Sequence, residues 1–214
     1  MKKMCSLLCG VAFLFSVPWA VSADPVDVQT PESQFSLVGG ELKFNAQPVV
    51  FDTKQISSKD WKGSTVSTDI GVTDDSGRAA GWTLTVSGGD FESPELPDPT
   101  SGGKGTYVLS YPVSSVEVRI GNVYVNSGQE IDPVHGPFAK GFFLNTSPQT
   151  IFNADPGYGM GDYQISPTFA LTVPKTVTVS KLQGEGSSYK IGDTVGAVAT
   201  TYKNRLTYTL STGI

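Results

Sequence analysis

The sequence has little of what catalytic, redox and metal sites are usually built from. Its 214 residues include two cysteines and one histidine, and both cysteines (Cys5 and Cys9) lie in the first nine positions. The rest of the chain therefore offers no disulfide, no thiol nucleophile and no Cys/His cluster with metal-ligand spacing. The single histidine, His135 in "DPVHGPF", has no companion ligands and is interpreted as a loop residue. The sequence predicts no catalytic residue, no metal and no cofactor.

Amphipathic helical periodicity is also missing. After Asp24, no window of a dozen residues keeps apolar positions at helical spacing without a Gly or Pro interruption. Short alternating runs rich in Val, Ile, Leu, Tyr and Phe are present instead, separated by Gly, Pro, Ser and Thr. This pattern favours an all-β, mainly antiparallel domain, either a sandwich or barrel-like, with long surface loops. The expected strands are residues 40–45, 48–53, 64–73, 81–87, 106–112, 116–126, 149–154, 166–173, 175–182 and 205–211.

The one long apolar run is at the N-terminus. "LLCGVAFLFSV" follows Lys2 and Lys3, and "VSA" precedes Asp24, which is the pattern of a secretory signal peptide, residues 1–23. A retained membrane anchor is the alternative. Cleavage would remove both lysines and change the formal charge from −5 to −7. An exported chain this acidic has no electrostatic reason to bind nucleic acid.

The remaining chain is expected to form one domain, or at most two small ones. Residues 24–39 are polar and contain proline, and they read as a flexible arm. Residues 40–214 are expected to form the β domain, which is long enough to bury a core without disulfides.

Three connections between the expected strands stand out, and two of them carry a functional alternative. "TDDSGRAAG" (residues 73–81) is interpreted as a hairpin turn, with a calcium site as the alternative. Residues 88–105 have no periodicity and read as a long surface excursion. "FNADPGYGMGDYQ" (residues 152–164) is interpreted as a glycine-rich turn between strands. Its functional alternative is a loop that presents Tyr158 and Tyr163 to a sugar ring while Asp155 and Asp162 accept hydroxyl protons.

An enzyme is disfavoured. Carboxylates are available for glycoside hydrolysis, for example Glu92, Glu95, Asp155 and Asp162, but no motif places any two of them as an acid–base pair. No serine lies in a nucleophile-elbow pattern either.

Two segments share an aromatic-Thr-Leu rhythm. In "GWTLTVS", Trp82 and Leu84 alternate with Thr83 and Thr85, and in "LTYTL", Tyr208 and Leu210 alternate with Thr207 and Thr209. Side chains alternate across a strand, so each segment has one apolar face and one threonine face. The pattern favours half-buried core strands, with Trp82 mostly buried, and the threonine faces are candidates for binding polysaccharide.

These segments, in their order, resemble the WxL domain, a non-covalent cell-wall-binding domain of surface proteins from low-GC Gram-positive bacteria. "GWTLTVS" resembles the first family motif and "YKNRLTYTLS" (residues 202–211) the second. The Asp-rich turn, the glycine-rich loop and "LTVP" (residues 171–174) also fall where the family has such features. The sequence departs from the family pattern at Tyr208, which replaces a second tryptophan, and at Arg205, where a small residue is usual.

The resemblance implies a secreted protein held at the cell surface on peptidoglycan or another wall glycan. It also implies association with membrane-anchored surface proteins. The candidate binding residues are Trp82, Thr83, Leu84, Tyr202, Tyr208, Thr209 and Leu210, with Tyr158, Asp162 and Tyr163 as secondary loop candidates. A protein-interaction module that assembles with other surface proteins by strand addition is the alternative function.

Overall fold

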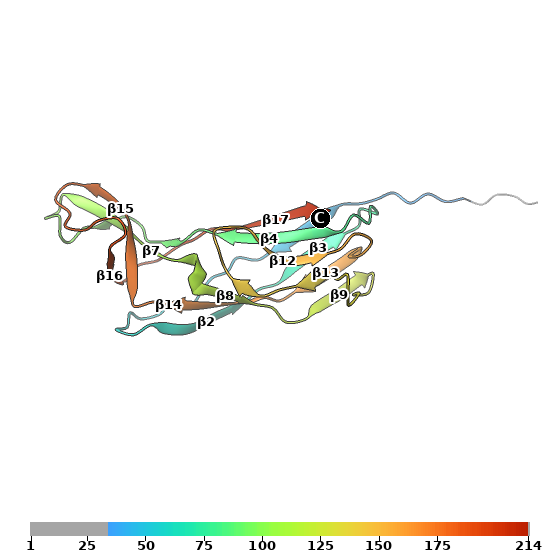
Figure 1. Cartoon of the computed structure of the whole chain (residues 1–214), viewed down its shortest axis with the longest axis horizontal. Helices are drawn as coiled ribbons and strands as arrows, with labels where there is room; N and C mark the ends of the chain where they lie inside the picture. The colour runs from blue at the N-terminus through green and yellow to red at the C-terminus, as the bar shows by residue number, and fades with distance from the viewer. Residues whose placement is uncertain (1–33, 214) are drawn as a thin grey trace, which may run out of the picture. The chain divides into compact units, whose positions relative to one another are not determined.

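The structure is a computed structural model that describes residues 34–213, and the chain divides into two units, residues 1–37 and 38–214. The predicted signal peptide and most of the predicted arm lie outside the described residues. All strands of the described residues belong to the second unit, where every strand pair is antiparallel and no sheet closes into a barrel (Figure 1). The all-β prediction is confirmed, and of its two forms the arrangement is consistent with the sandwich.

Two of the four-stranded sheets contain most of the candidate site residues. One holds Asp162 and Tyr163, and the other holds both motif strands. The first, called sheet A, has the order β1 (Leu42–Ala46), β3 (Ile70–Asp74), β13 (Gly161–Ile165) and β9 (Val123–Gly128). The second, called sheet C, has the order β10 (Phe138–Ala139), β12 (Gln149–Ala154), β4 (Trp82–Gly88) and β17 (Leu206–Thr212).

Two further sheets complete the unit. Sheet B has the order β11 (Phe142–Phe143), β8 (Val116–Arg119), β14 (Thr168–Val173) and β2 (Trp61–Ser67). Sheet D has the order β16 (Thr194–Gly196), β15 (Thr176–Gly184), β7 (Gly105–Tyr111) and β5 (Phe91–Glu92), with β6 (Leu96–Pro97) paired to β7. One 3₁₀ turn, η1 (Val113–Ser115), precedes β8. No helix among residues 34–213 is both long and apolar enough to cross a membrane.

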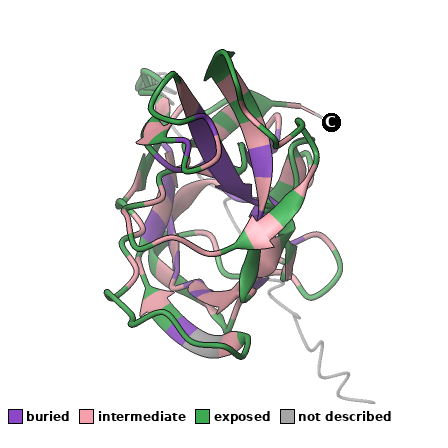
Figure 2. Cartoon of the chain, turned by 90° about the vertical axis from the view of Figure 1, so that its left-hand side faces the viewer, coloured by how far each residue is buried: buried purple, intermediate pink, exposed green. Residues whose placement is uncertain are grey.

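The core lies between the sheets and follows the alternation of the strands. In β4, Trp82, Leu84 and Val86 are fully buried, and in sheet A the same holds for Val72 of β3 and Tyr163 of β13. Figure 2 shows buried residues in purple on several strands. The apolar transfer of one large buried ring contributes roughly 2–4 kcal/mol, so alternating strands of this kind stabilise a sandwich effectively.

Several strand boundaries differ from the sequence expectation. Residues 64–73 form two strands, β2 and β3, in sheets B and A, and residues 116–126 likewise divide into β8 and β9. Each predicted strand contained a break at which the chain moves from one sheet to the other. Residues 48–53 form no strand.

The "TDDSGRAAG" segment is not a hairpin, because β3 and β4 belong to different sheets and do not pair. It is a connection from one layer of the sandwich to the other. Asp74 is buried at 4 % exposure, and its Oδ1 accepts a hydrogen bond from the Ser76 backbone N–H at 3.0 Å. This is the Asx-type turn that an aspartate makes with the backbone two residues later.

The two long loops are more ordered than the sequence indicates. Residues 88–105 contain β5 and β6, and they bury Asp98 and Ser101 to 2 % and 5 % exposure. The glycine-rich segment is divided between β12 and β13, so only residues 155–160 form the turn.

Candidate functional site

Sheet C brings six of the seven motif candidates together. Strands β4 and β17 are neighbours in an unbroken register, in which Leu84 is opposite Leu210 and Val86 is opposite Tyr208. The two motif segments, 124 residues apart along the chain, therefore form one paired surface. The residues that meet there are Trp82, Thr83, Leu84, Tyr208, Thr209 and Leu210.

Trp82 is a core residue. Its exposure is 0 %, and its ring lies edge-on to Phe152 at a centroid distance of 4.8 Å. Its indole Nε1 donates a hydrogen bond to the Gly159 carbonyl oxygen at 2.9 Å. Both the ring and its donor are thus satisfied inside the protein, and Trp82 holds β4 against the core.

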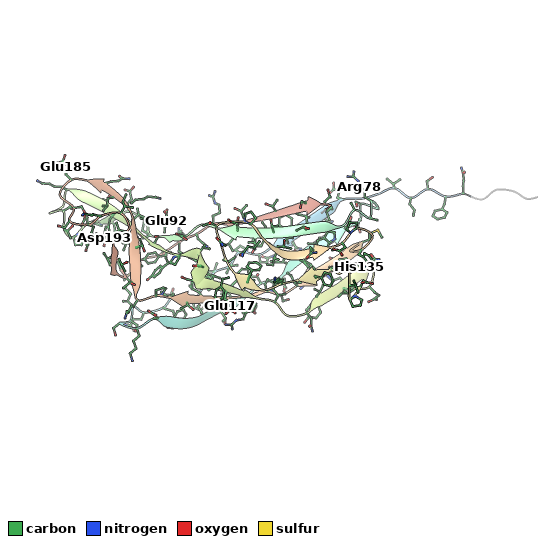
Figure 3. All side chains as sticks on the ribbon, in the orientation of Figure 1. Arg78, Glu92, Glu117, His135, Glu185 and Asp193 are labelled. Atoms are coloured by element: carbon green, nitrogen blue, oxygen red, sulfur yellow. The ribbon has the colours of Figure 1, made fainter. Side chains whose placement is uncertain are left out.

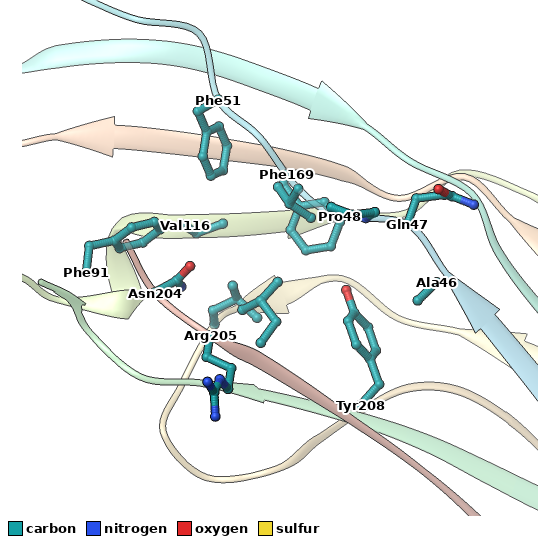
Figure 4. A pocket seen from close by; sticks show the side chains of 13 residues that line it. Ala46, Gln47, Pro48, Phe51, Phe91, Val116, Phe169, Asn204, Arg205 and Tyr208 are labelled. Atoms are coloured by element: carbon teal, nitrogen blue, oxygen red, sulfur yellow. The ribbon is translucent and has the colours of Figure 1, made fainter. Parts of the chain in front are cut away.

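Tyr208 faces a groove between the segment that follows β1 and the start of β17. The groove has a volume of about 400 Å³, and its lining includes Pro48, Phe169 and Tyr208 (Figure 4). The Tyr208 ring is 6.5 Å from that of Phe44 in β1. Burial raises the pKa of Tyr208 to about 12. Its hydroxyl oxygen is buried and has no hydrogen-bond partner among residues 34–213.

The side of sheet C that faces away from the core carries hydroxyl and amide groups on β4, β12 and β17, and the exposed Phe138 of β10 lies beside them, opposite Asn153. We call it the hydroxyl face. Thr85 in β4 is opposite both Thr209 in β17 and Thr150 in β12, and Thr83 is opposite both Ser211 and Asn153. None of its members carries a charge. They are Thr83, Thr85, Ser87, Thr150, Asn153, Thr207, Thr209 and Ser211.

Hydrogen bonds within the hydroxyl face are few and long. The Thr85 hydroxyl donates to the Thr209 carbonyl at 3.4 Å, and the Ser211 hydroxyl donates to the Thr83 carbonyl at 3.3 Å. Both distances lie at the weak end of the range for a hydroxyl donor. The hydroxyls of this face thus keep capacity for an external hydrogen-bonding ligand.

The sequence did not reveal the contribution of β12. A register shift lies between Thr150 and Phe152 where β12 pairs with β4, so Ile151 and Phe152 are both buried. A bulge of this kind breaks the period-two pattern, and alternation along "QTIFNA" no longer shows that Thr150 and Asn153 face outward together. The adjacent apolar residues Ile151 and Phe152 were the only sign in the sequence that this strand contains a bulge.

The secondary loop candidates divide among three environments. Tyr163 is fully buried, and its hydroxyl donates to the Gln129 carbonyl at 2.6 Å, so the expectation that this residue meets a sugar ring is wrong. Alternation along β13 explains this, because Tyr163 takes the core side. Asp162 takes the outer side of sheet A, where its Oδ1 accepts a 3.4 Å hydrogen bond from the Thr73 hydroxyl. Tyr158 is half-buried, and one face of its ring stacks on His135 at 4.4 Å.

Tyr202 lies before β17 and outside sheet C. Its ring packs edge-on against Tyr111 of β7 at 4.7 Å, and its hydroxyl donates to the Val198 carbonyl at 3.2 Å. Burial raises the pKa of Tyr202 above its ordinary value. The structure gives this motif residue a packing role between sheet D and the segment that leads into β17.

The carboxylates considered for hydrolysis belong to two parts of the unit. Glu92 of β5 pairs with Lys181 at 2.7 Å, and Glu95, which precedes β6, accepts a 3.2 Å hydrogen bond from Gln183; both partners lie in β15 of sheet D. Asp155 lies in the turn between β12 and β13, and Asp162 lies in β13 of sheet A. In Figure 3 the labelled Glu92 lies toward the end of the unit that carries β15 and β16, and His135 lies at the opposite end. Among residues 34–213 no group of three or more His, Cys, Asp or Glu side chains is arranged to hold a metal ion.

The fold is an all-β arrangement consistent with a sandwich, and its hydroxyl face is built from uncharged side chains. The chain belongs to the WxL domain family of surface cell wall-binding proteins, whose pattern it matches over residues 18–213. Association with the cell surface or wall follows from that membership. No curated protein and no solved structure was found to match the chain.

Proposed function

We propose that this protein is secreted and attaches non-covalently to the peptidoglycan of a Gram-positive cell wall through the hydroxyl face of sheet C. The observation that carries the proposal is the register of β4 and β17. Burial of Trp82 and Leu84 on one side turns Thr83 and Thr85 outward beside Thr209. The aromatic motif residues thus act from inside the sheet, by holding a hydrogen-bonding surface in place.

The chemistry of the face fits a glycan. Sugar hydroxyls and acetamide groups both donate and accept hydrogen bonds, and threonine, serine and asparagine side chains do the same. Each hydrogen bond has a modest net value, on the order of 1 kcal/mol, so a useful affinity needs several in parallel. A face built from two long strands and β12 can supply them to an extended polymer.

Sedimentation with isolated cell walls tests the proposal. The chain that remains after removal of the predicted signal peptide is expected to be enriched in the wall pellet over an inert acidic protein. The paired variant Thr85→Val with Thr209→Val keeps side-chain shape and removes two hydroxyls. We expect about tenfold weaker wall binding from it, because two hydrogen bonds are lost.

A matched control is available on sheet D, where Thr178 of β15 is directly opposite Thr194 of β16. Thr178→Val with Thr194→Val removes the same chemical groups from another sheet and is expected to leave wall binding unchanged. Absence of wild-type enrichment on the walls would refute wall attachment. Equal losses in the two paired variants would refute the assignment to sheet C.

The second candidate function is a module that assembles with other surface proteins, including membrane-anchored ones. It is favoured by one observation, the outer edge of β17 in sheet C, which pairs with no other strand among residues 34–213. Walls stripped of protein separate the two functions. Attachment to glycan persists on stripped walls, whereas attachment through a protein partner is lost.

A further inference from the structure

The outer edge of β17 is the least protected strand edge among the described residues. An edge strand presents unpaired backbone N–H and C=O groups, and proteins usually guard such edges with short strands, charges or bulges. Strand β17 is seven residues long, contains no charged residue, no glycine and no proline, and pairs with β4 without a register shift. Its backbone hydrogen bonds within the described part of the chain run to the β4 side.

The other sheet edges of residues 34–213 show these protections. Strands β5, β10 and β11 have two residues each, and β16 has three. Strand β1 carries Lys43, and the pairings of β2 and β9 with their neighbours contain register shifts. The contrast singles out β17 as an edge that is left able to pair.

The sequence of β17 is complementary to itself. When "LTYTLST" is paired antiparallel with a second copy about Thr209, Thr207 is opposite Ser211 and Tyr208 is opposite Leu210. Hydroxyl residues then meet hydroxyl residues on the outer face. On the core side Tyr208 meets Leu210, and at the ends of the strand Leu206 meets Thr212. The same register places Arg205 of one copy opposite Gly213 of the other, so the nearest cation does not face another cation.

We propose that β17 pairs with β17 of a second copy of this chain, about a two-fold axis through Thr209. A two-fold interface uses the same patch on both copies and closes on itself, so it yields a dimer and not a filament. The two four-stranded sheets C join into one, and their hydroxyl faces become a single surface of twice the width. For a polymeric ligand, two linked faces bind more tightly than one because the second contact is intramolecular.

Sedimentation velocity of the purified chain, without any wall material, tests this pairing. A strand-pair interface is small, so we expect concentration-dependent dimerisation between about 10 µM and about 500 µM. Thr209→Glu places two carboxylates opposite each other at the two-fold axis, and Thr209→Lys places two ammonium groups there. We expect each variant alone to dimerise at least about fivefold more weakly, because like charges directly opposite each other destabilise a strand pair.

The mixture of the two variants is the decisive measurement. In an equimolar mixture, the carboxylate introduced in one copy lies opposite the ammonium group introduced in the other, so association is expected to recover to the wild-type level or above. Thr85→Glu, on the same face but on the inner strand β4, is the control and is expected to dimerise as the wild type does. Far-ultraviolet circular dichroism confirms that every variant is folded.

A wild-type chain that stays monomeric up to about 500 µM overturns the proposal. So does dimerisation that Thr209→Glu leaves unchanged, because another surface then carries it, and so does a mixture that fails to recover. Since no wall material is present, each of these results leaves the proposed wall attachment untouched. Pairing that needs an added surface protein would identify a heterologous strand as the occupant of this edge, again overturning self-pairing.

Discussion

The indole nitrogen of Trp82 donates a hydrogen bond to the carbonyl oxygen of Gly159, 77 residues further along the chain. The contact joins the first motif strand to the glycine-rich turn between β12 and β13. Gly159 has φ = +75°, and a Cβ built on it would lie 2.7 Å from Trp82 Nε1 and 2.4 Å from the Ala154 Cβ. The tryptophan and the glycine are therefore parts of one structural unit.

Gly159→Ala is expected to destabilise the protein strongly. The substitution combines the strain of positive φ in a non-glycine residue with an overlap against a buried ring. We expect a loss of about 2–5 kcal/mol in the free energy of unfolding, measured by urea denaturation. Gly157→Ala is the matched control, since Gly157 has φ = +89° and open space around its Cβ position. An equal loss in both variants would show that the overlap with Trp82 contributes nothing.

The emission of Trp82 reports its burial directly. After removal of residues 1–23, the chain has two tryptophans, Trp61 and Trp82. In a Trp61→Phe background we expect blue-shifted emission that iodide quenches poorly and wall fragments do not shift. The reciprocal Trp82→Phe variant leaves Trp61, which is partly exposed beneath the Lys54 ammonium group at 4.8 Å. Its emission is expected to be red-shifted and quenchable. A Trp82 signal that responds to wall fragments contradicts the core assignment.

Tyr208 is expected to make stability fall at alkaline pH. Burial raises its pKa from 10.0 to about 12 in the folded state. The folded state thus holds the proton more tightly than the unfolded state does. The resulting stabilisation is complete below the unfolded pKa of 10.0, and it is lost as the pH rises through about 12.

Tyr208→Phe tests this pH dependence and removes a buried hydroxyl that has no partner among the described residues. Near neutral pH the variant is expected to be at least as stable as the wild type, since an unsatisfied hydroxyl costs about 1–3 kcal/mol. Its unfolding free energy should decline less between pH 10 and 12. Tyr111, whose pKa burial also raises to about 12, accounts for part of the remaining decline. If Tyr208→Phe lost stability with pH as the wild type does, ionisation of Tyr208 would not be the cause of the alkaline loss of stability.

Wall binding is expected to be nearly independent of salt. The hydroxyl face carries no charge, and the chain without residues 1–23 has a formal charge of −7, which gives no attraction to an anionic wall. At about 0.5 M NaCl, where charge interactions are screened within a few ångströms, we expect the bound fraction to stay close to its low-salt value. A basic protein of similar size, held by charge, serves as the control and should elute. Release of this protein by NaCl alone would assign the binding to charge.

Much of the fold could be read from short-range patterns. Alternation in "GWTLTVS" and "LTYTL" assigned the inward and outward residues of β4 and β17 correctly, because side-chain direction in a strand depends only on position. The order of motifs likewise identified the family. The sequence reading failed where the chain changes sheets, at residues 68–69 and 120–122, because a break of two or three residues does not show which sheet the next strand joins.

The sequence by itself determined that this is an all-β chain with buried aromatic strands and outward threonines, since alternation and composition are local properties. Only the tertiary structure decided that β4 and β17 are neighbours, that Tyr163 is buried beside Trp82, and that β12 adds Thr150 and Asn153 to the same face. Those relationships depend on pairing between distant segments and on one bulge. Such pairings are selected by the packing of the whole core, and no single segment encodes them.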